Sequence, residues 1–226
     1  MKVSIVLAAL SASSAMGHYF FPRTITGSSR SADWQFVRET ANNPQSGPVE
    51  DVSSPLMACY EKSGRPAAAV QTVAAGSRFG LTSSASMGHP GPSLWYIARV
   101  PDGQNVNSWN PTGNVWAKID QYGSTPAANP PFTSNMQEIY TTIPSGLRPG
   151  NYLLRYEHIG LHIAGAPQFY IACAQIAVTG SGTASPPSSA LVSFPGAYAR
   201  SDPGLTFVIY GNTNSYPYPG PAVWRP

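Results

Sequence analysis

Apolar and polar positions alternate along this chain in short runs, and clusters of glycine, proline, serine and asparagine separate the runs. Runs of this kind are typical of β-strands, whereas the spacing of an amphipathic helix is scarce. We expect strands at Val70–Val73, Arg78–Leu81, Leu94–Val100, Val115–Ile119, Glu138–Ile143, Asn151–Glu157, Gln168–Val178 and Phe207–Tyr210. The pattern predicts an all-β fold, an antiparallel β-sandwich of the immunoglobulin or fibronectin type with long loops.

The first 17 residues have the pattern of a secretory signal peptide. Lys2 supplies a positive start, Val3–Leu10 is an apolar run too short to span a membrane, and Ala15 and Gly17 are small residues at the positions that a signal peptidase reads. Cleavage after Gly17 would make His18 the first mature residue, whereas cleavage after Ala15 would not. We expect the first of these, and therefore a secreted, extracellular protein.

Length and composition fit one domain over residues 18–226. Only 10% of the residues are charged, and the 21 glycines and 23 prolines indicate many turns. The net charge is only +3 and the chain has no Lys/Arg block, so we do not expect a nucleic acid as partner. No apolar run after the N-terminus is long enough to cross a bilayer, so we do not expect a membrane either. Ser181–Ser189 resembles a linker, but the roughly forty residues after it are too few for a domain. They are expected to extend over the sandwich, without a carbohydrate-binding module.

The chain has only two cysteines, Cys59 and Cys173. An oxidising compartment would pair them, and closing so long a loop would stabilise the fold by about 4–5 kcal/mol. The alternative is a thiolate metal site, which would need further ligands near the two sulfur atoms.

The four histidines, His18, His89, His158 and His162, all stand in positions that suggest metal binding. A terminal His18 would offer a metal its α-amino nitrogen and its ring Nδ1, because the amine loses its proton at modest cost. His89 lies on a stiff loop rich in glycine and proline, where a lone histidine is more often unliganded. Two imidazoles and one amine would give three nitrogen donors, a set that favours copper(II).

Other polar residues leave more than one interpretation. The spacing of His158 and His162 would suggest zinc on a helix, but the run Asn151–Arg155 before them favours a strand that ends in a loop. Gln168 and Tyr170 begin the next predicted strand and point to one face of it. From the residues alone, Tyr170 is either a core tyrosine or part of a site.

Short stretches along nearly the whole mature chain match one known family, in that family's order. They are the signal peptide ending before His18 and the segments Pro55–Cys59, Gly88–Pro92, Val115–Ile119, Tyr152–His162, Gln168–Cys173, Phe194–Tyr198, Asp202–Gly204 and Pro219–Pro221. Each is weak alone, but together they are highly specific. On these residues the chain resembles the lytic polysaccharide monooxygenases of auxiliary activity family 9, once classed among glycoside hydrolases.

This resemblance implies a copper site known as a histidine brace. His18 would bind one copper ion through its amine and Nδ1, and His89 through Nε2. Tyr170 would take a distant axial position. His162 and Gln168 match the pair that hydrogen-bonds the oxygen co-substrate at the metal.

The resemblance also implies roles for residues around the site. His158 matches no ligand and is expected to be structural. Tyr216 matches a tyrosine that stacks on sugar rings across a flat face, and Tyr19 and Tyr210 are weaker candidates for the same contact. The pair Cys59–Cys173 matches a disulfide of the family.

The implied activity is oxidative cleavage of a β-1,4-glucan, with cellulose as the first candidate, by hydroxylation at C1 or C4. Copper would carry the difficult step, with O2 or H2O2 as oxidant and a small-molecule reductant or redox protein as electron donor. The stretch Trp34–Thr40 resembles members that oxidise C1. The enzyme is expected to be a monomer.

Two other classes of function stay open. A glycoside hydrolase needs two carboxyl groups at a suitable separation, and Glu157 alone among the 10 acidic residues lies beside the histidine motifs. A non-catalytic copper- or carbohydrate-binding protein could use the same fold. Sugar products separate the three: oxidised ends, plain reducing ends, or none.

Overall fold

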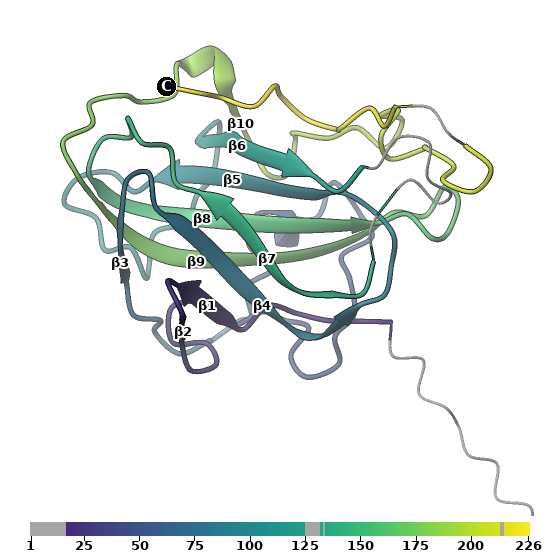
Figure 1. The fold of residues 1–226 in the computed structure, drawn as a ribbon, viewed down its shortest axis with the longest axis horizontal. Helices are drawn as coiled ribbons and strands as arrows, with labels where there is room; N and C mark the ends of the chain where they lie inside the picture. Colours follow the sequence, from purple (N-terminus) through teal and green to yellow (C-terminus); the bar gives the residue numbers. More distant parts are fainter. Residues whose placement is uncertain (1–16, 125–131, 133, 213–214) are drawn as a thin grey trace, which may run out of the picture.

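The computed structural model describes residues 17–124, 132, 134–212 and 215–226 as two β-sheets packed face to face (Figure 1). The strands are β1 (Arg23–Thr26), β2 (Ser29–Arg30), β3 (Gln71–Ala74), β4 (Arg78–Met87), β5 (Ser93–Arg99), β6 (Trp116–Tyr122), β7 (Met136–Thr142), β8 (Gly150–Gly160), β9 (Gln168–Thr179) and β10 (Leu191–Val192). The smaller sheet has the order β2-β1-β4-β7, and the larger has the order β10-β6-β5-β8-β9-β3. Two short 3-10 helices, η1 (Pro55–Met57) and η2 (Ser188–Ala190), lie in loops. No helix in these ranges is long and apolar enough to cross a membrane.

The strands β8 and β9 are buried on both faces, and this explains their nearly continuous apolar sequence. Alternate residues of a strand point to opposite faces. Leu154 and Tyr156 therefore enter the core between the two sheets. Leu153 and Ile159 point to the outer face, where they join a second apolar cluster under the long loops.

The predicted β-sandwich is confirmed, and seven of the eight expected strands correspond to β3–β9. The expected strand Phe207–Tyr210 is wrong: this segment is a loop, and its apolar residues Phe207 and Ile209 pack on the outer cluster instead of pairing. The short strands β1, β2 and β10 were not expected, because their few residues form no apolar alternation. In addition, β3 pairs parallel with β9, so the larger sheet is mixed.

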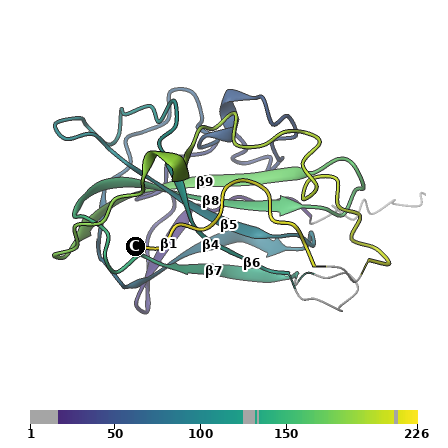
Figure 2. The same cartoon turned by 90° about the horizontal axis from the view of Figure 1, so that it is seen from above.

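The chain beyond β9 lies against the edge of the larger sheet, where Figure 1 shows it in green to yellow above β10 and β6. In that segment β10 pairs with β6. The backbone of Trp224 donates to the carbonyl of Lys118 at 2.8 Å, and the Lys118 ammonium donates to the carbonyl of Pro219 at 2.6 Å. Seen from above in Figure 2, the yellow segment runs along the sandwich rather than away from it.

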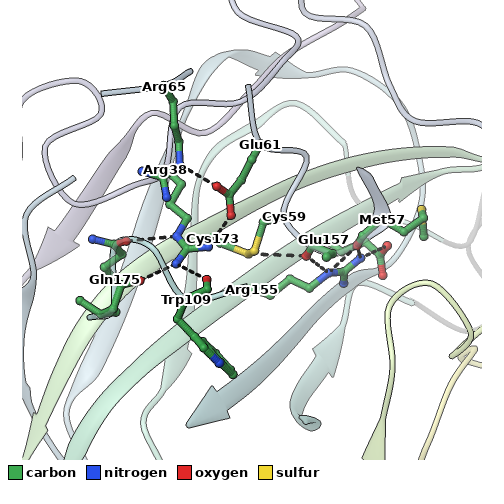
Figure 3. The surroundings of a disulfide bond; sticks show 12 residues. Arg38, Met57, Cys59, Glu61, Arg65, Trp109, Arg155, Glu157, Cys173 and Gln175 are labelled. Carbon is green, nitrogen blue, oxygen red and sulfur yellow. Dashed lines mark hydrogen bonds and ion pairs between the residues drawn. A yellow bond between two sulfur atoms is a disulfide. The ribbon is translucent and has the colours of Figure 1, made fainter. Parts of the chain in front are cut away.

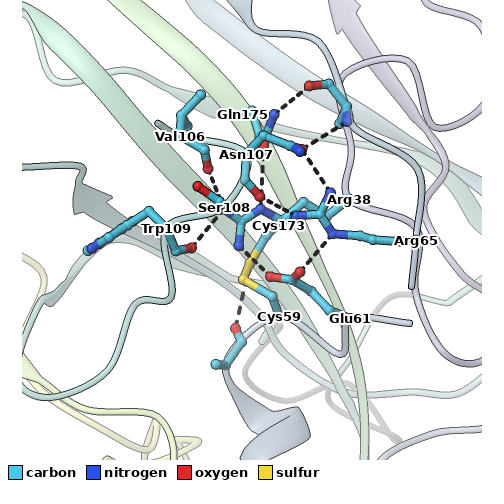
Figure 4. A network of polar contacts seen from close by, with 12 residues as sticks. Arg38, Cys59, Glu61, Arg65, Val106, Asn107, Ser108, Trp109, Cys173 and Gln175 are labelled. Atoms are coloured by element: carbon cyan, nitrogen blue, oxygen red, sulfur yellow. Dashed lines mark hydrogen bonds and ion pairs between the residues drawn. A yellow bond between two sulfur atoms is a disulfide. The ribbon is translucent and has the colours of Figure 1, made fainter. Parts of the chain in front are cut away.

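The expected disulfide between Cys59 and Cys173 is present and ties the loop after η1 to β9 (Figure 3). Beside it lies a polar cluster in which the Glu61 carboxylate accepts hydrogen bonds from two arginines, the buried Arg38 and Arg65 (Figure 4). The long loop between β2 and β3 is thus held on the larger sheet by one covalent bond and a set of charged contacts.

Candidate metal centre

Three histidines from distant parts of the sequence meet at one end of the sandwich. His18 precedes β1, His89 follows β4, and His162 follows β8. The ring centroids of His18 and His89 are 5.7 Å apart, and those of His89 and His162 are 3.7 Å apart. The structure therefore brings together the three imidazoles that the sequence placed at or beside a metal.

The loop that carries His89 is packed directly against the end of β8. The backbone of Leu161 donates to the carbonyl of Pro90 at 2.9 Å. A Cβ atom on Gly91 would lie only 1.7 Å from the carbonyl oxygen of Ile159. Only glycine fits at this position, and the close approach determines where the neighbouring His89 lies.

Two ring nitrogens at this site are buried and have no hydrogen-bond partner among the described residues: Nε2 of His89 and Nδ1 of His162. Burial, aided by the nearby His162 and His18, lowers the pKa of His89 to about 4. Burial, then His18, also lowers the pKa of His162. Both rings are thus favoured in the neutral form, which is the form that binds metal ions. A buried nitrogen without a partner costs about 1–3 kcal/mol, so the Nε2 atom of His89 fits a metal bond.

The backbone of Gly17 lies in front of that same nitrogen. A Cβ atom on Gly17 would be 2.7 Å from Cε1 and 3.1 Å from Nε2 of His89. A cut after Gly17 would remove this backbone and leave the new amine of His18 next to the His89 ring. Within the described ranges no three His, Cys, Asp or Glu side chains are arranged so that they could hold a metal ion. The new amine would add a nitrogen donor beside the rings of His18 and His89. The rest of the expected signal peptide, residues 1–16, lies outside the described residues.

Tyr170 lies under the histidines and is fully buried. Its ring centroid is 6.1 Å from that of His18 and 5.8 Å from that of His89. Its hydroxyl donates to Oε1 of Gln168 at 2.8 Å, and burial raises its pKa. Tyr170 is therefore both a core tyrosine and a neighbour of the site, so the two interpretations of the sequence do not exclude each other.

Gln168 has a partner that the sequence did not indicate. Its Nε2 donates to Oε1 of Glu50 at 3.4 Å. Glu50 reaches this position because its neighbour Val49 forms an isolated bridge with Phe169, the residue after Gln168. A contact between residues so far apart in the chain leaves no local pattern, and no sequence signal could have found it.

His158 supports the site from inside the core. Its Nδ1 is 2.5 Å from the hydroxyl of Tyr19, and its Nε2 is 3.2 Å from the carbonyl oxygen of Gly91. A carbonyl only accepts, so Nε2 carries the proton and the Tyr19 hydroxyl donates to Nδ1. Burial lowers the pKa of His158 to about 3, which keeps the ring neutral. The Tyr19 ring also stacks on that of Tyr170 at 4.2 Å, so His158 acts through structural contacts.

Two of the three tyrosines expected to stack on substrate are not available for that contact. Tyr19 is 0% exposed and Tyr216 is 5% exposed. The Tyr216 hydroxyl donates to the carbonyl of Gly204, and its ring packs against Phe207. Tyr210, at 56% exposed, is the one candidate of the three that reaches solvent. The loops turn Tyr19 and Tyr216 inward, and the sequence alone did not indicate this.

The acid beside the histidine motifs is also enclosed. Glu157 is fully buried, and its carboxylate accepts from Arg155 at 2.8 Å and from the hydroxyl of Tyr198 at 2.5 Å. It therefore cannot serve as the solvent-facing acid that a glycoside hydrolase needs.

Comparison with known proteins identifies the family. A family model described as Auxiliary Activity family 9 (formerly GH61) matches residues 18–218. The chain is 48% identical over 222 residues to lytic polysaccharide monooxygenase H of Malbranchea cinnamomea, covering 95% of both chains. It is 44% identical over 228 residues to monooxygenase F of Neurospora crassa, covering 99% of this chain and 98% of that one.

A solved structure shares the fold. It is a cellulose-active polysaccharide monooxygenase from M. thermophila, with a TM-score of 0.75 and 30% identity over 92% of this chain and 99% of that one. The family resemblance seen in the sequence motifs is thus confirmed by the sequence comparison and by the solved structure. The chain belongs to Auxiliary Activity family 9, as do the two lytic polysaccharide monooxygenases named above.

Proposed function

We propose that this chain is a secreted, copper-dependent lytic polysaccharide monooxygenase that cleaves a β-1,4-glucan oxidatively. One observation carries the proposal most directly. The buried Nε2 of His89 has no partner among the described residues, and the backbone between Gly17 and His18 lies beside it. Processing after Gly17 would create an amine, a further nitrogen donor, beside that ring.

The residues present fit one copper ion. The amine and Nδ1 of His18 and the Nε2 of His89 would hold it, and the buried Tyr170 would lie close to it. Copper, when bound, supplies the one-electron chemistry that lets O2 or H2O2 attack a sugar C–H bond, which amino-acid side chains alone do not perform. A small-molecule reductant or redox protein supplies the electrons.

The protein's own groups hold and orient the reactants. His162 has a neutral ring whose exposed side faces solvent, so it can donate a hydrogen bond or pass a proton to the oxygen co-substrate. Gln168 is held in place by the Tyr170 hydroxyl and by Glu50, and its amide would position that co-substrate. Oxidation would be at C1 or C4 of the sugar, and the stretch Trp34–Thr40 favours C1.

Substrate, compartment and oligomeric state are parts of the same proposal. Cellulose is favoured because a solved relative is described as cellulose-active. Export is supported by the signal-peptide pattern and by the disulfide between Cys59 and Cys173, which persists in oxidising compartments. Tyr210 is the exposed tyrosine that would stack on the glucan, and the enzyme would act as a monomer.

The test uses the mature chain beginning at His18, loaded with copper and incubated with cellulose and a reductant. Mass spectrometry of the soluble sugars should find aldonic ends, 4-keto ends, or both. The matched variant His89→Ala should bind copper more than about 100-fold more weakly, since even supporting residues contribute 10–100-fold, and should release no oxidised sugars. Near-ultraviolet circular dichroism would verify its fold.

Two outcomes would overturn the proposal. Plain reducing ends that form without copper or reductant would indicate hydrolysis. Tight copper binding without any sugar product, on cellulose and on other β-glucans, would indicate a binding protein.

A further inference from the structure

A cavity lies at the opposite end of the sandwich from the histidines. It is lined by residues at the beginning of β8 and the end of β5, including Tyr152 and Arg99. His162 follows the other end of β8, the end that carries the arrowhead in Figure 1. Eleven strand residues separate the two ends, about 30 Å at the usual rise. The cavity is therefore independent of the candidate metal centre.

Most of the cavity wall is apolar. Ile97 and Tyr152 come from the core between the sheets, and Val115, Pro186 and Leu191 close the sides. The volume is about 180 Å³, smaller than the sites that take drug-sized molecules, so only a compact ligand fits. Walls of this kind favour a compact apolar body over a sugar, whose many hydroxyl groups would lack partners.

One strong polar donor points to the kind of ligand. The Nε atom of Arg99 is buried and has no hydrogen-bond partner in the part of the chain that the structure describes. The same side chain donates through Nη2 to Asp102 at 2.6 Å. This bond fixes the guanidinium and leaves its Nε atom free to meet another group. Leaving this one buried N–H of the guanidinium without a partner is unfavourable.

The local charge has the sign that a carboxylate needs. Asp102 is shared by two arginines, because Arg148 also lies 3.9 Å from its carboxylate. Two positive charges against one negative charge leave an excess of one positive charge beside the cavity. A guanidinium and a carboxylate form the charge-assisted, often paired hydrogen bonds that are the strongest of this kind.

We propose that this cavity binds an organic monocarboxylate with a compact apolar body, aromatic or aliphatic. The carboxylate pairs with Arg99, and the body lies against Ile97, Val115 and Leu191. The polar groups Asn114 and Ser185 stand at the rim. Inorganic phosphate does not fit, because it offers nothing to the apolar wall, and neutral aromatics do not fit, because they leave the Nε atom of Arg99 without a partner.

The test is isothermal titration of the copper-loaded mature protein with benzoate, hexanoate, benzyl alcohol and inorganic phosphate. We expect saturable binding of one or both carboxylates, and no saturable binding of the alcohol or phosphate. The ratio of benzoate to hexanoate affinity then tells which body the cavity prefers. An unchanged copper electron paramagnetic resonance spectrum shows that the acid is not on the metal.

Two variants locate the binding. Arg99→Gln should weaken carboxylate binding about 10-fold or more, because a hydrogen bond to a charged group is lost. Leu191→Trp should block the cavity and abolish binding without touching the charge. Arg200→Gln, which changes an exposed arginine elsewhere, is the matched control and should bind like the original chain.

The proposal is overturned if neither carboxylate binds saturably, or if benzyl alcohol binds as tightly as benzoate. It is also overturned if Leu191→Trp, shown to be folded by its unfolding transition, binds benzoate unchanged. Release of oxidised sugars should be the same in all variants. A failure of carboxylate binding is therefore distinguishable from a failure of the proposed oxidase activity.

Discussion

The imidazole rings of His89 and His162 lie parallel, with their centroids 3.7 Å apart and their planes inclined by only 7°. Two cationic rings at this distance would repel each other strongly, and burial lowers the pKa of both. The stacked pair is thus stable as two neutral rings. Under the proposed function, His89 would bind the metal and His162 would lie beside it for hydrogen bonding.

The first prediction separates these two roles. His162→Ala should leave the copper affinity within about tenfold of the original, while the rate of oxidised-sugar release falls about 10–100-fold, the usual effect of a residue that supports a metal site. Copper titration and product mass spectrometry measure the two quantities. Ile163→Ala, at the exposed next position, is the control. Loss of copper binding in His162→Ala would instead make His162 a ligand.

The second prediction concerns the N-terminus. A chain that begins at Ser11 and retains Gly17 has a peptide nitrogen at His18 instead of an amine, and its backbone still crosses in front of His89. We expect copper affinity to be lower by more than about 100-fold, with no oxidised products. Removing residues 11–17 from the same preparation should restore both. An extended chain that oxidises cellulose as fast as the mature one would contradict the brace.

The third prediction tests the buried bond under the site. Tyr19→Phe removes the hydroxyl that donates to Nδ1 of His158 at 2.5 Å and leaves a buried acceptor unpaired. The free energy of unfolding should fall by about 1–3 kcal/mol, measured with urea on the metal-free chain. Tyr210→Phe, at an exposed ring, should change it by less than about 0.5 kcal/mol. Equal effects of the two substitutions would show that the Tyr19 hydroxyl contributes nothing.

The fourth prediction follows from the buried ammonium of Lys118. Burial lowers its pKa from 10.5 to about 8, so between about pH 8 and 10 the unfolded chain binds more protons at this group than the folded one. The contribution of Lys118 to the free energy of unfolding should therefore rise with pH across this window, seen as the difference between the original chain and Lys118→Met. Urea unfolding at several pH values measures the slope. Lys118→Met should lose that slope, and a slope that persists unchanged would assign it to another group.

The fifth prediction concerns the disulfide, whose two residues are 114 positions apart. Replacing both Cys59 and Cys173 by serine frees the unfolded chain from this loop and should lower the free energy of unfolding by about 4–5 kcal/mol. Chemical unfolding measures the loss. Copper affinity should stay within about tenfold, because neither sulfur touches the histidines. A loss of metal binding at temperatures where the variant is still folded would contradict this separation.

Local patterns revealed most of the strands and the residue types of the site. Alternation of apolar and polar residues predicted the strands from β3 to β9, because successive side chains of a strand point to opposite faces of the sheet. The failed strand at Phe207–Tyr210 has a similar apolar content, but its residues bury themselves by packing on the outer cluster. The short strands β1 and β10 pair with the longer β4 and β6, and β2 pairs with β1.

The sequence by itself determined the family, the two-sheet architecture, the disulfide partners and the small set of histidines available to a metal. Only the tertiary structure decided that Tyr19 and Tyr216 face inward, that Glu50 reaches Gln168, and that the cavity beside Arg99 exists. The physical reason is the distance along the chain between the residues that interact. Strand patterns and motifs are local, whereas burial and pairing depend on contacts between segments that come together only when the two sheets and their loops close.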